Sequence, residues 1–102
     1  MQFLIIARDF KPEGLQRRLA VRSQHVALGD KLRASGNFLY GVAMLDDEGT
    51  MRGSTMVMDF GSKTELDAWL KTEPYVTGHV WENIEISPCA VGPTFSKEQS
   101  PK

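Results

Sequence analysis

The stretch "NFLYGVAMLDDEGTMRGSTMVMDF", residues 37–60, predicts two β-strands joined by a turn at "DDEG". Alternate residues of a strand point to opposite faces of its sheet. In the first strand, one set is Phe38, Tyr40, Val42 and Met44, and the other is Leu39, Gly41, Ala43 and Leu45. Both sets are largely apolar, so we expect both faces of the sheet to be covered.

Two further strands are expected near the ends of the chain. Residues 3–7 form an apolar run between polar neighbours, which is typical of a strand buried on both faces. A last strand is predicted over about residues 79–87. In it, Val80, Glu82, Ile84 and Ile86 alternate with Trp81, Asn83 and Glu85.

Two helices connect these strands. The first is predicted over residues 14–34, with Gly36 just past its end. Its expected inward side consists of Leu15, Leu19, Val21, His25, Leu28 and Leu32. The second begins at an S-x-x-E capping box formed by Ser62 and Glu65 and is ended by Pro74.

The resulting order, βαββαβ, predicts a ferredoxin-like α+β fold. Right-handed crossovers place both helices on one face of a four-stranded antiparallel sheet. The other face then needs a cover, because burial of one aliphatic side chain is worth roughly 1.5–3 kcal/mol. We therefore expect a homodimer formed through the sheet face, from one domain of residues 1–91 followed by a flexible tail of residues 92–102.

Composition narrows the classes of partner. The chain has 102 residues and a formal net charge of −1, so it has no basic surplus with which to bind nucleic acid or an anionic membrane. The apolar run near the N-terminus is too short for a signal peptide or a membrane span. A single cysteine, Cys89, excludes an intrachain disulfide and favours a reducing, cytoplasmic location.

His25 is the candidate reactive residue, because it lies on the inward side of the first helix. A lone histidine in such a position is commonly a structural residue. Arg18 and Arg22 lie two turns and one turn before it, and their guanidinium groups are suited to binding a carboxylate. Alternatively, the two arginines extend into solvent or pair with Asp30 or Glu13.

Glu73 is the candidate partner of His25, because it is held at a helix end against Pro74. A carboxylate beside a histidine would fix the imidazole tautomer. Spacing alone does not determine whether the two meet, and a solvated glutamate is the alternative. His25 and His79 have no metal-ligand spacing and the glycines are scattered, so neither a metal nor a nucleotide cofactor is expected.

Four segments together resemble the YCII-related (YciI-like) family of the dimeric α+β barrel class over roughly residues 1–90. They are the N-terminal strand, "RRLAVRSQH" with its R-x-x-H pattern, "GST" at the third strand, and "EPYVTGHVWENIEISP". The resemblance implies a histidine–aspartate active site, in which His25 matches the histidine and Glu73 occupies the aspartate position. It also implies relatives that dehalogenate a chlorinated hydroxymuconolactone or isomerise muconolactones.

Two functions are consistent with these residues. In the first, the chain is a small lyase, isomerase or dehalogenase acting on a small anionic oxo-acid or lactone. His25 is then the general acid or base and Glu73 orients it, while Arg22 and Arg18 bind the anion and Ser54 and Tyr75 donate hydrogen bonds. In the second, the same pocket is a non-catalytic binding or sensing module for a small anion.

Overall fold

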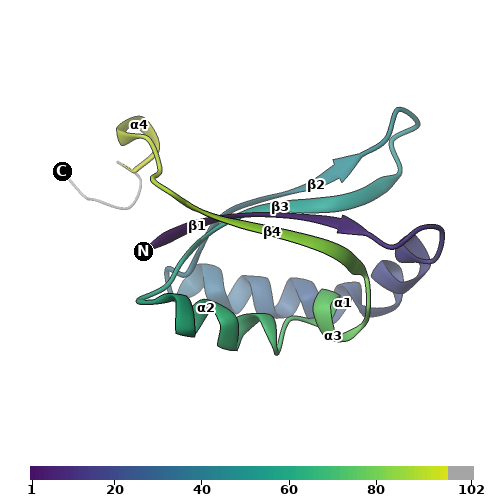
Figure 1. The fold of residues 1–102 in the computed structure, drawn as a ribbon, viewed down its shortest axis with the longest axis horizontal. Coiled ribbons are helices and arrows are strands. Elements are labelled where there is room, and N and C mark those ends of the chain that lie inside the picture. The colour runs from purple at the N-terminus through teal and green to yellow at the C-terminus, as the bar shows by residue number, and fades with distance from the viewer. Residues whose placement is uncertain (97–102) are drawn as a thin grey trace.

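The computed structural model describes residues 1–96 and contains one four-stranded antiparallel sheet (Figure 1). The strands are β1 (Gln2–Asp9), β2 (Phe38–Leu45), β3 (Met51–Asp59) and β4 (Trp81–Cys89). Their spatial order is β2-β3-β1-β4. The helices are α1 (Gly14–Ala34), α2 (Lys63–Leu70), α3 (Pro74–Thr77) and α4 (Pro93–Ser96). The chain therefore has the predicted ferredoxin-like α+β order.

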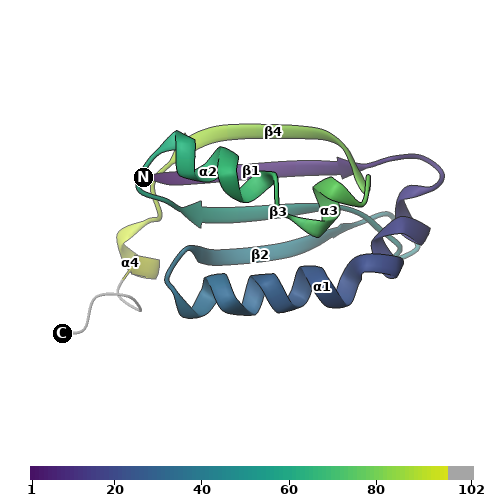
Figure 2. The same ribbon diagram turned by 90° about the horizontal axis from the view of Figure 1, so that it is seen from below.

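One face of the sheet carries α1, α2 and α3, as Figures 1 and 2 show from two directions. Helix α1 lies beside β2, whereas α2 and α3 lie over the other strands (Figure 2). The core fills the space between these helices and the sheet and includes Ile5, Met58 and Leu66, each fully buried. Helix α2 begins where the side chain of Ser62 accepts a hydrogen bond from the backbone of Glu65.

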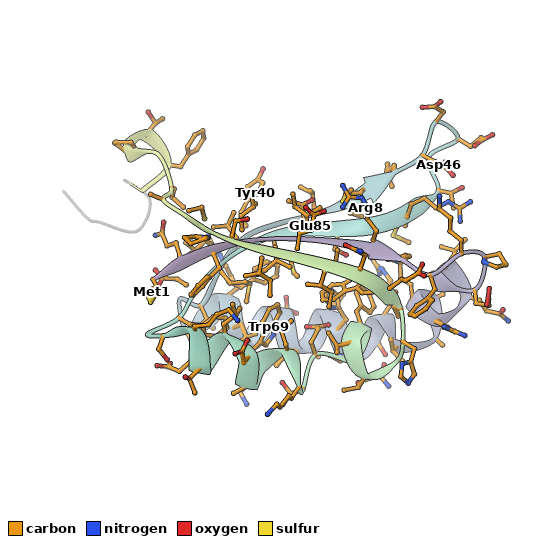
Figure 3. The ribbon with its side chains drawn as sticks, viewed as in Figure 1. Met1, Arg8, Tyr40, Asp46, Trp69 and Glu85 are labelled. Atoms are coloured by element: carbon orange, nitrogen blue, oxygen red, sulfur yellow. The ribbon has the colours of Figure 1, made fainter. Side chains whose placement is uncertain are left out.

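The opposite face, which we call the open face, carries no helix except α4 at one end, among residues 1–96 (Figure 1). Its strand residues include Leu4, Ile6, Tyr40, Val42 and Val57. Tyr40 is 71% exposed and Val42 is 49% exposed. Figure 3 shows Tyr40, Arg8 and Glu85 on this face, opposite Trp69. The open face thus mixes exposed apolar side chains with the Arg8–Glu85 ion pair.

The predicted alternation in β2 is wrong at its start. Phe38 pairs with Met58 and Tyr40 pairs with Val57, so Leu39 is an extra residue in the strand. A bulge of this kind changes which face the following residues occupy. Phe38 therefore lies on the helix side together with Gly41, while Tyr40 and Val42 lie on the open face.

A second irregularity lies between β1 and β4. Arg8 pairs with Asn83 but Asp9 pairs with Trp81, so the alternation predicted for the last strand breaks at Glu82. Val80 and Trp81 are both buried, instead of pointing to opposite faces. The strand also extends to Cys89, beyond the predicted end.

The inward side of α1 also differs from the prediction. Leu19 is 57% exposed, whereas Arg18 is buried. The helix begins and ends as predicted, at Gly14 and Ala34. The inward stripe therefore runs through Arg18, Val21, His25, Leu28 and Leu32, with a charged residue in place of a leucine.

Within the predicted tail, the short helix α4 forms over Pro93–Ser96. The remainder of the predicted tail, residues 97–102, lies outside the described residues. None of the helices in the described part of the chain has the length and apolar character required to cross a membrane.

Candidate active site

His25 and Glu73 meet beneath the sheet, although 48 positions separate them in the sequence. Glu73 precedes Pro74, the first residue of α3, and caps that helix: its Oε1 accepts a hydrogen bond of 3.1 Å from the backbone N–H of Tyr75. The same Oε1 is hydrogen-bonded to Nδ1 of His25. Glu73 is only 2% exposed, so the carboxylate is a fixed part of the interior.

The hydrogen bond to Glu73 determines which nitrogen of the His25 imidazole carries a proton. An ionised carboxylate can only accept hydrogen bonds, so Nδ1 of His25 carries a proton and Nε2 is left as the acceptor. Among residues 1–95, the only hydrogen bond of the His25 ring is the one to Glu73. The His25 side chain is 18% exposed, so the ring lies at the edge of the interior. The arrangement suits a general base at Nε2 with a carboxylate behind it.

Tyr75 fixes the plane of the imidazole. The two rings stack with centroids 3.8 Å apart and planes 9° apart. Trp81 approaches His25 edge-on, with centroids 6.4 Å apart. Burial raises the pKa of the Tyr75 hydroxyl above its ordinary value of 10.0, although the nearby Arg18 and Arg22 oppose this shift. Tyr75 therefore keeps its proton and remains a hydrogen-bond donor at neutral pH.

Arg18 is held by a buried acid that the sequence reasoning missed. Its Nε and Nη2 donate to the two oxygens of Asp9 at 2.9 and 2.8 Å, and Nη2 also donates to Ser54 at 3.0 Å. Arg18 and Asp9 are each 3% exposed at the side chain. The guanidinium carbon lies 4.7 Å from the centroid of the Tyr75 ring. Arg18 thus pairs with Asp9 rather than with Asp30 or Glu13.

Because Asp9 and Ser54 together occupy three of its five N–H donors, Arg18 holds the site together more than it binds a ligand. Asp9 could have been found from the alternation of β1, which places it on the same face as the buried Phe3, Ile5 and Ala7. A carboxylate on a buried face requires a charged or hydrogen-bonding partner. The sequence alone did not identify which arginine supplies it.

Arg22 is the cation that stays accessible. It is exposed and has no carboxylate partner in the described part of the chain, and it lines the same cavity as His25. This cavity, which we call the small chamber, has a volume of about 190 Å³. Ser54 and Tyr75 also line it, whereas His79 is exposed in the connection between α3 and β4 and does not.

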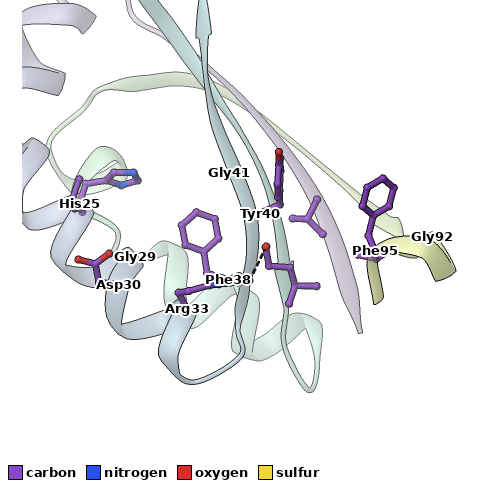
Figure 4. A pocket seen from close by; sticks show the side chains of 13 residues that line it. His25, Gly29, Asp30, Arg33, Phe38, Tyr40, Gly41, Gly92 and Phe95 are labelled. Atoms are coloured by element: carbon purple, nitrogen blue, oxygen red, sulfur yellow. Dashed lines mark hydrogen bonds between the residues drawn. The ribbon is translucent and has the colours of Figure 1, made fainter. Parts of the chain in front are cut away.

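The small chamber exists because β2 has small residues opposite α1. Gly41 and Ala43 line it where larger side chains would fill it. A second cavity of about 780 Å³, which we call the groove, follows α1 and β2 toward α4 (Figure 4). Four residues line both spaces, namely His25, Val26, Phe38 and Gly41. Within residues 1–96, no cluster of three His, Cys, Asp or Glu side chains could hold a metal ion.

The family model for the YCII-related domain matches residues 1–90. The chain belongs to the YCII-related family. Protein YciI of Escherichia coli O6:H1 is 33% identical to this YCII-related domain over 94 residues, which cover 86% of this chain and 95% of that protein. A protein of Haemophilus influenzae is 32% identical with the same coverage.

Solved structures share the fold of this YCII-related domain. The 5-chloro-2-hydroxyhydroquinone dehydrochlorinase TftG of Burkholderia phenoliruptrix AC1100, in complex with 2,5-dihydroxybenzoquinone, superposes with a TM-score of 0.80 at 23% identity. The match covers 92% of this chain and 98% of TftG. An antibiotic biosynthesis monooxygenase matches with a TM-score of 0.52 at 17% identity, over 91% of this chain and all of that one. Both likenesses are evidence for the fold alone.

Proposed function

We propose that this YCII-related domain is a small lyase, isomerase or dehalogenase in which His25 and Glu73 act as a general acid/base pair on a small oxo-acid or lactone. The observation that carries the proposal is the His25–Glu73 hydrogen bond at the edge of a cavity that also contains the accessible cation Arg22. A fixed tautomer, a fixed ring plane and an anion-binding group are what proton transfer from carbon requires.

The proposed first step breaks a C–H bond next to the substrate carbonyl. Nε2 of His25 takes the proton, and the electron pair of that bond moves toward the carbonyl oxygen to give an enolate. The carboxylate of Glu73 stabilises the resulting imidazolium. The proton then returns at a different atom, or the enolate expels a leaving group such as chloride, which would give an isomerase or an eliminating enzyme respectively.

The remaining residues have supporting roles. Arg22 binds the substrate anion, as an exposed guanidinium can bind a carboxylate in a bidentate manner. Ser54 accepts from Arg18, so its own hydroxyl hydrogen is free to bind a substrate oxygen. Tyr75, whose raised pKa keeps it protonated, supplies a second donor. Arg18 holds Ser54 and Tyr75 in position through its contacts with both side chains. TftG is a dehydrochlorinase, and dehydrochlorination is an elimination.

The proposal is tested by proton exchange rather than by a particular product. Small 2-oxo acids and lactones are incubated with the protein in D2O, and loss of the proton next to the carbonyl is followed by ¹H NMR. We expect His25→Gln to slow the exchange by about 10²–10⁴-fold, the usual contribution of a general base. His79→Gln, at the only other histidine, is the matched control and should exchange at the wild-type rate.

If His25→Gln exchanges as fast as the wild type, the general-base role is wrong. Retained binding of the same acids, with loss of binding in Arg22→Gln, would then support the non-catalytic binding module.

We further propose a homodimer formed through the open face. The exposed Tyr40 and Val42 and the half-buried Leu4, Ile6 and Val57 supply apolar surface to such an interface. The single cysteine, Cys89, makes a reducing compartment such as the cytoplasm the expected location.

A further inference from the structure

Asp9 is a buried carboxylate that lines neither the small chamber nor the groove. It ends β1 at the point where the register with β4 shifts, so that Arg8 pairs with Asn83 and Asp9 pairs with Trp81. Regular alternation after Asn83 would place Trp81 on the open face. The bulge turns it inward instead, next to Asp9. A buried charge and a buried indole thus lie side by side at the end of β1.

Gly14 allows α1 to begin close against Asp9. A Cβ atom on Gly14 would lie 2.6 Å from Cβ of Asp9 and 3.3 Å from its carbonyl carbon, so no other residue fits there without a shift of the strand end. Arg18 lies one turn further along the same side of the helix. This close approach brings the guanidinium of Arg18 within hydrogen-bond reach of both oxygens of Asp9.

The Tyr75 ring lies between the side chains of Arg18 and His25. The imidazole covers one face of this ring at a centroid distance of 3.8 Å, and the guanidinium carbon lies over the ring at 4.7 Å from its centroid. The guanidinium therefore lies against the other face. Arg18 and His25 are two turns apart on α1, about 10 Å along the helix axis, which leaves room for a ring between them.

Trp81 borders this stack from the side. Its ring approaches that of Tyr75 with centroids 5.7 Å apart and that of His25 with centroids 6.4 Å apart, close to perpendicular to both. The plane of the imidazole thus depends on Tyr75 and Trp81. Tyr75 is held by Arg18, Arg18 is held by Asp9, and Trp81 is placed by the bulge beside Asp9.

We propose that Asp9 is a positioning residue of the His25 site: by holding Arg18 against Tyr75, it fixes the plane in which the imidazole presents Nε2 to the substrate. The assignment rests on the proposed function, because it takes Nε2 as the base. Asp9 lines neither cavity and so does not touch the substrate. Its loss should slow proton transfer and leave binding of the anion by Arg22 unchanged.

The main variant is Asp9→Val/Arg18→Met, which leaves no unpaired charge in the interior and should therefore fold. In the D2O exchange assay, we expect kcat to fall by about 10–100-fold, because a misplacement of about 1 Å can cost such a factor. KM should stay near the wild-type value. Asp67→Asn is the matched control, since Asp67 is an ion-paired carboxylate on the exposed side of α2, and it should exchange at the wild-type rate.

Arg18→Lys is a second variant that retains a buried cation for Asp9. Lysine lacks the planar group that lies against Tyr75, so this variant should keep the fold and slow the exchange in the same direction, with KM again unchanged. A further measurement needs no substrate. In ¹H NMR spectra, the ring protons of His25 should be shifted upfield by the stacked Tyr75 relative to those of the exposed His79. This difference should decrease in both variants and not in Asp67→Asn.

Wild-type exchange and wild-type His25 shifts in both variants would overturn the assignment and leave the Asp9–Arg18 pair a purely stabilising role. A raised KM with unchanged kcat would also overturn it, because Arg18 would then bind the substrate directly. If His25→Gln exchanges as fast as the wild type, the proposed function is wrong. The NMR shifts then decide by themselves whether Asp9 positions the imidazole.

Discussion

One carboxylate oxygen of Glu73 holds two donors, the ring Nδ1 of His25 and the backbone N–H of Tyr75. The start of α3 and the orientation of the imidazole therefore depend on the same atom. Tyr75, the residue whose backbone is bound in this way, also stacks against the imidazole. A substitution of Glu73 should therefore change the tautomer of His25 as well as lower the stability of the fold.

We predict that Glu73→Ala populates the Nε2–H tautomer of His25, because no carboxylate remains to hold the proton at Nδ1. The measurement is ¹⁵N NMR of the imidazoles, in which His79 serves as the internal reference. Loss of the helix cap should also lower the free energy of unfolding by about 0.5–2 kcal/mol. Glu73→Asp retains the charge and should keep the Nδ1–H form. A wild-type His25 found in the Nε2–H form would contradict the assignment.

The raised pKa of Tyr75 has a consequence at alkaline pH. Burial raises this pKa, so above its ordinary value of 10.0 the unfolded chain releases the proton before the folded one does. The stabilising contribution is complete below about pH 10 and is lost as the pH rises through the folded-state value. We predict that denaturant unfolding at pH 9–11 shows a fall in stability that is smaller in Tyr75→Phe. Tyr40→Phe, at the exposed tyrosine, should leave the fall unchanged.

At the scale of the elements, the Asp9–Arg18 pair connects β1 to α1, and Ser54 extends the connection to β3. Removing one partner of a buried ion pair leaves the other charge unpaired in the interior. We predict that Arg18→Met lowers the free energy of unfolding by about 3–5 kcal/mol. The double variant Asp9→Val/Arg18→Met should recover most of that loss, because no buried charge is left.

The exposed pair Lys63–Asp67 on α2 supplies the comparison. Lys63→Met should change the free energy of unfolding by less than about 1 kcal/mol, as is usual for a pair in solvent. Equal losses in Lys63→Met and Arg18→Met would contradict a special role for the buried pair.

The order of the four strands with α1 and α2 could be predicted because each depends on local patterns, such as the apolar run of β1 and the Ser62 cap of α2. The short helices α3 and α4 were not part of that prediction, and Pro74 begins α3 instead of ending α2, which stops at Leu70.

The bulges at Leu39 and Glu82 could not be predicted. An extra residue at Leu39 and another at Glu82 leave the local alternation of apolar residues nearly intact, yet they change the face of Phe38 and of Trp81. Pairing with a neighbouring strand determines such bulges, and that pairing is not encoded in the strand itself.

In the candidate active site, too, local patterns predict single residues but not the contacts between distant ones. Helical spacing predicts that His25 faces inward, and Pro74 predicts the rigid backbone at Glu73. Their contact, across 48 positions, could be proposed only from the family resemblance. The burial of Asp9 could not be predicted from the apolar residues of β1, because they stop at Ala7 while the buried face of the strand continues to Asp9. The partner of Arg18 could not be predicted for the same reason, because that partner is Asp9.

At the scale of the whole molecule, the open face predicts self-association. We predict that the wild type sediments with twice the chain mass of 11.4 kDa, and that Val57→Lys sediments as a monomer because a charge at the centre of the open face cannot be buried unpaired. Leu19→Lys adds the same charge at an exposed position of α1 and should remain dimeric. Sedimentation velocity over a range of concentrations checks all three proteins; a monomeric wild type at micromolar concentration would contradict the proposal.

Gly29, Gly41 and Ala43 leave space beside His25 because their side chains are absent or small. A mutational survey that shortens side chains one at a time would pass over these three positions, because they have almost nothing to lose. Only substitutions that add bulk would reveal them. Among homologous chains, exchange of a single hydrogen for a methyl group at such a position would alter which molecule fits, while leaving every reactive group where it was.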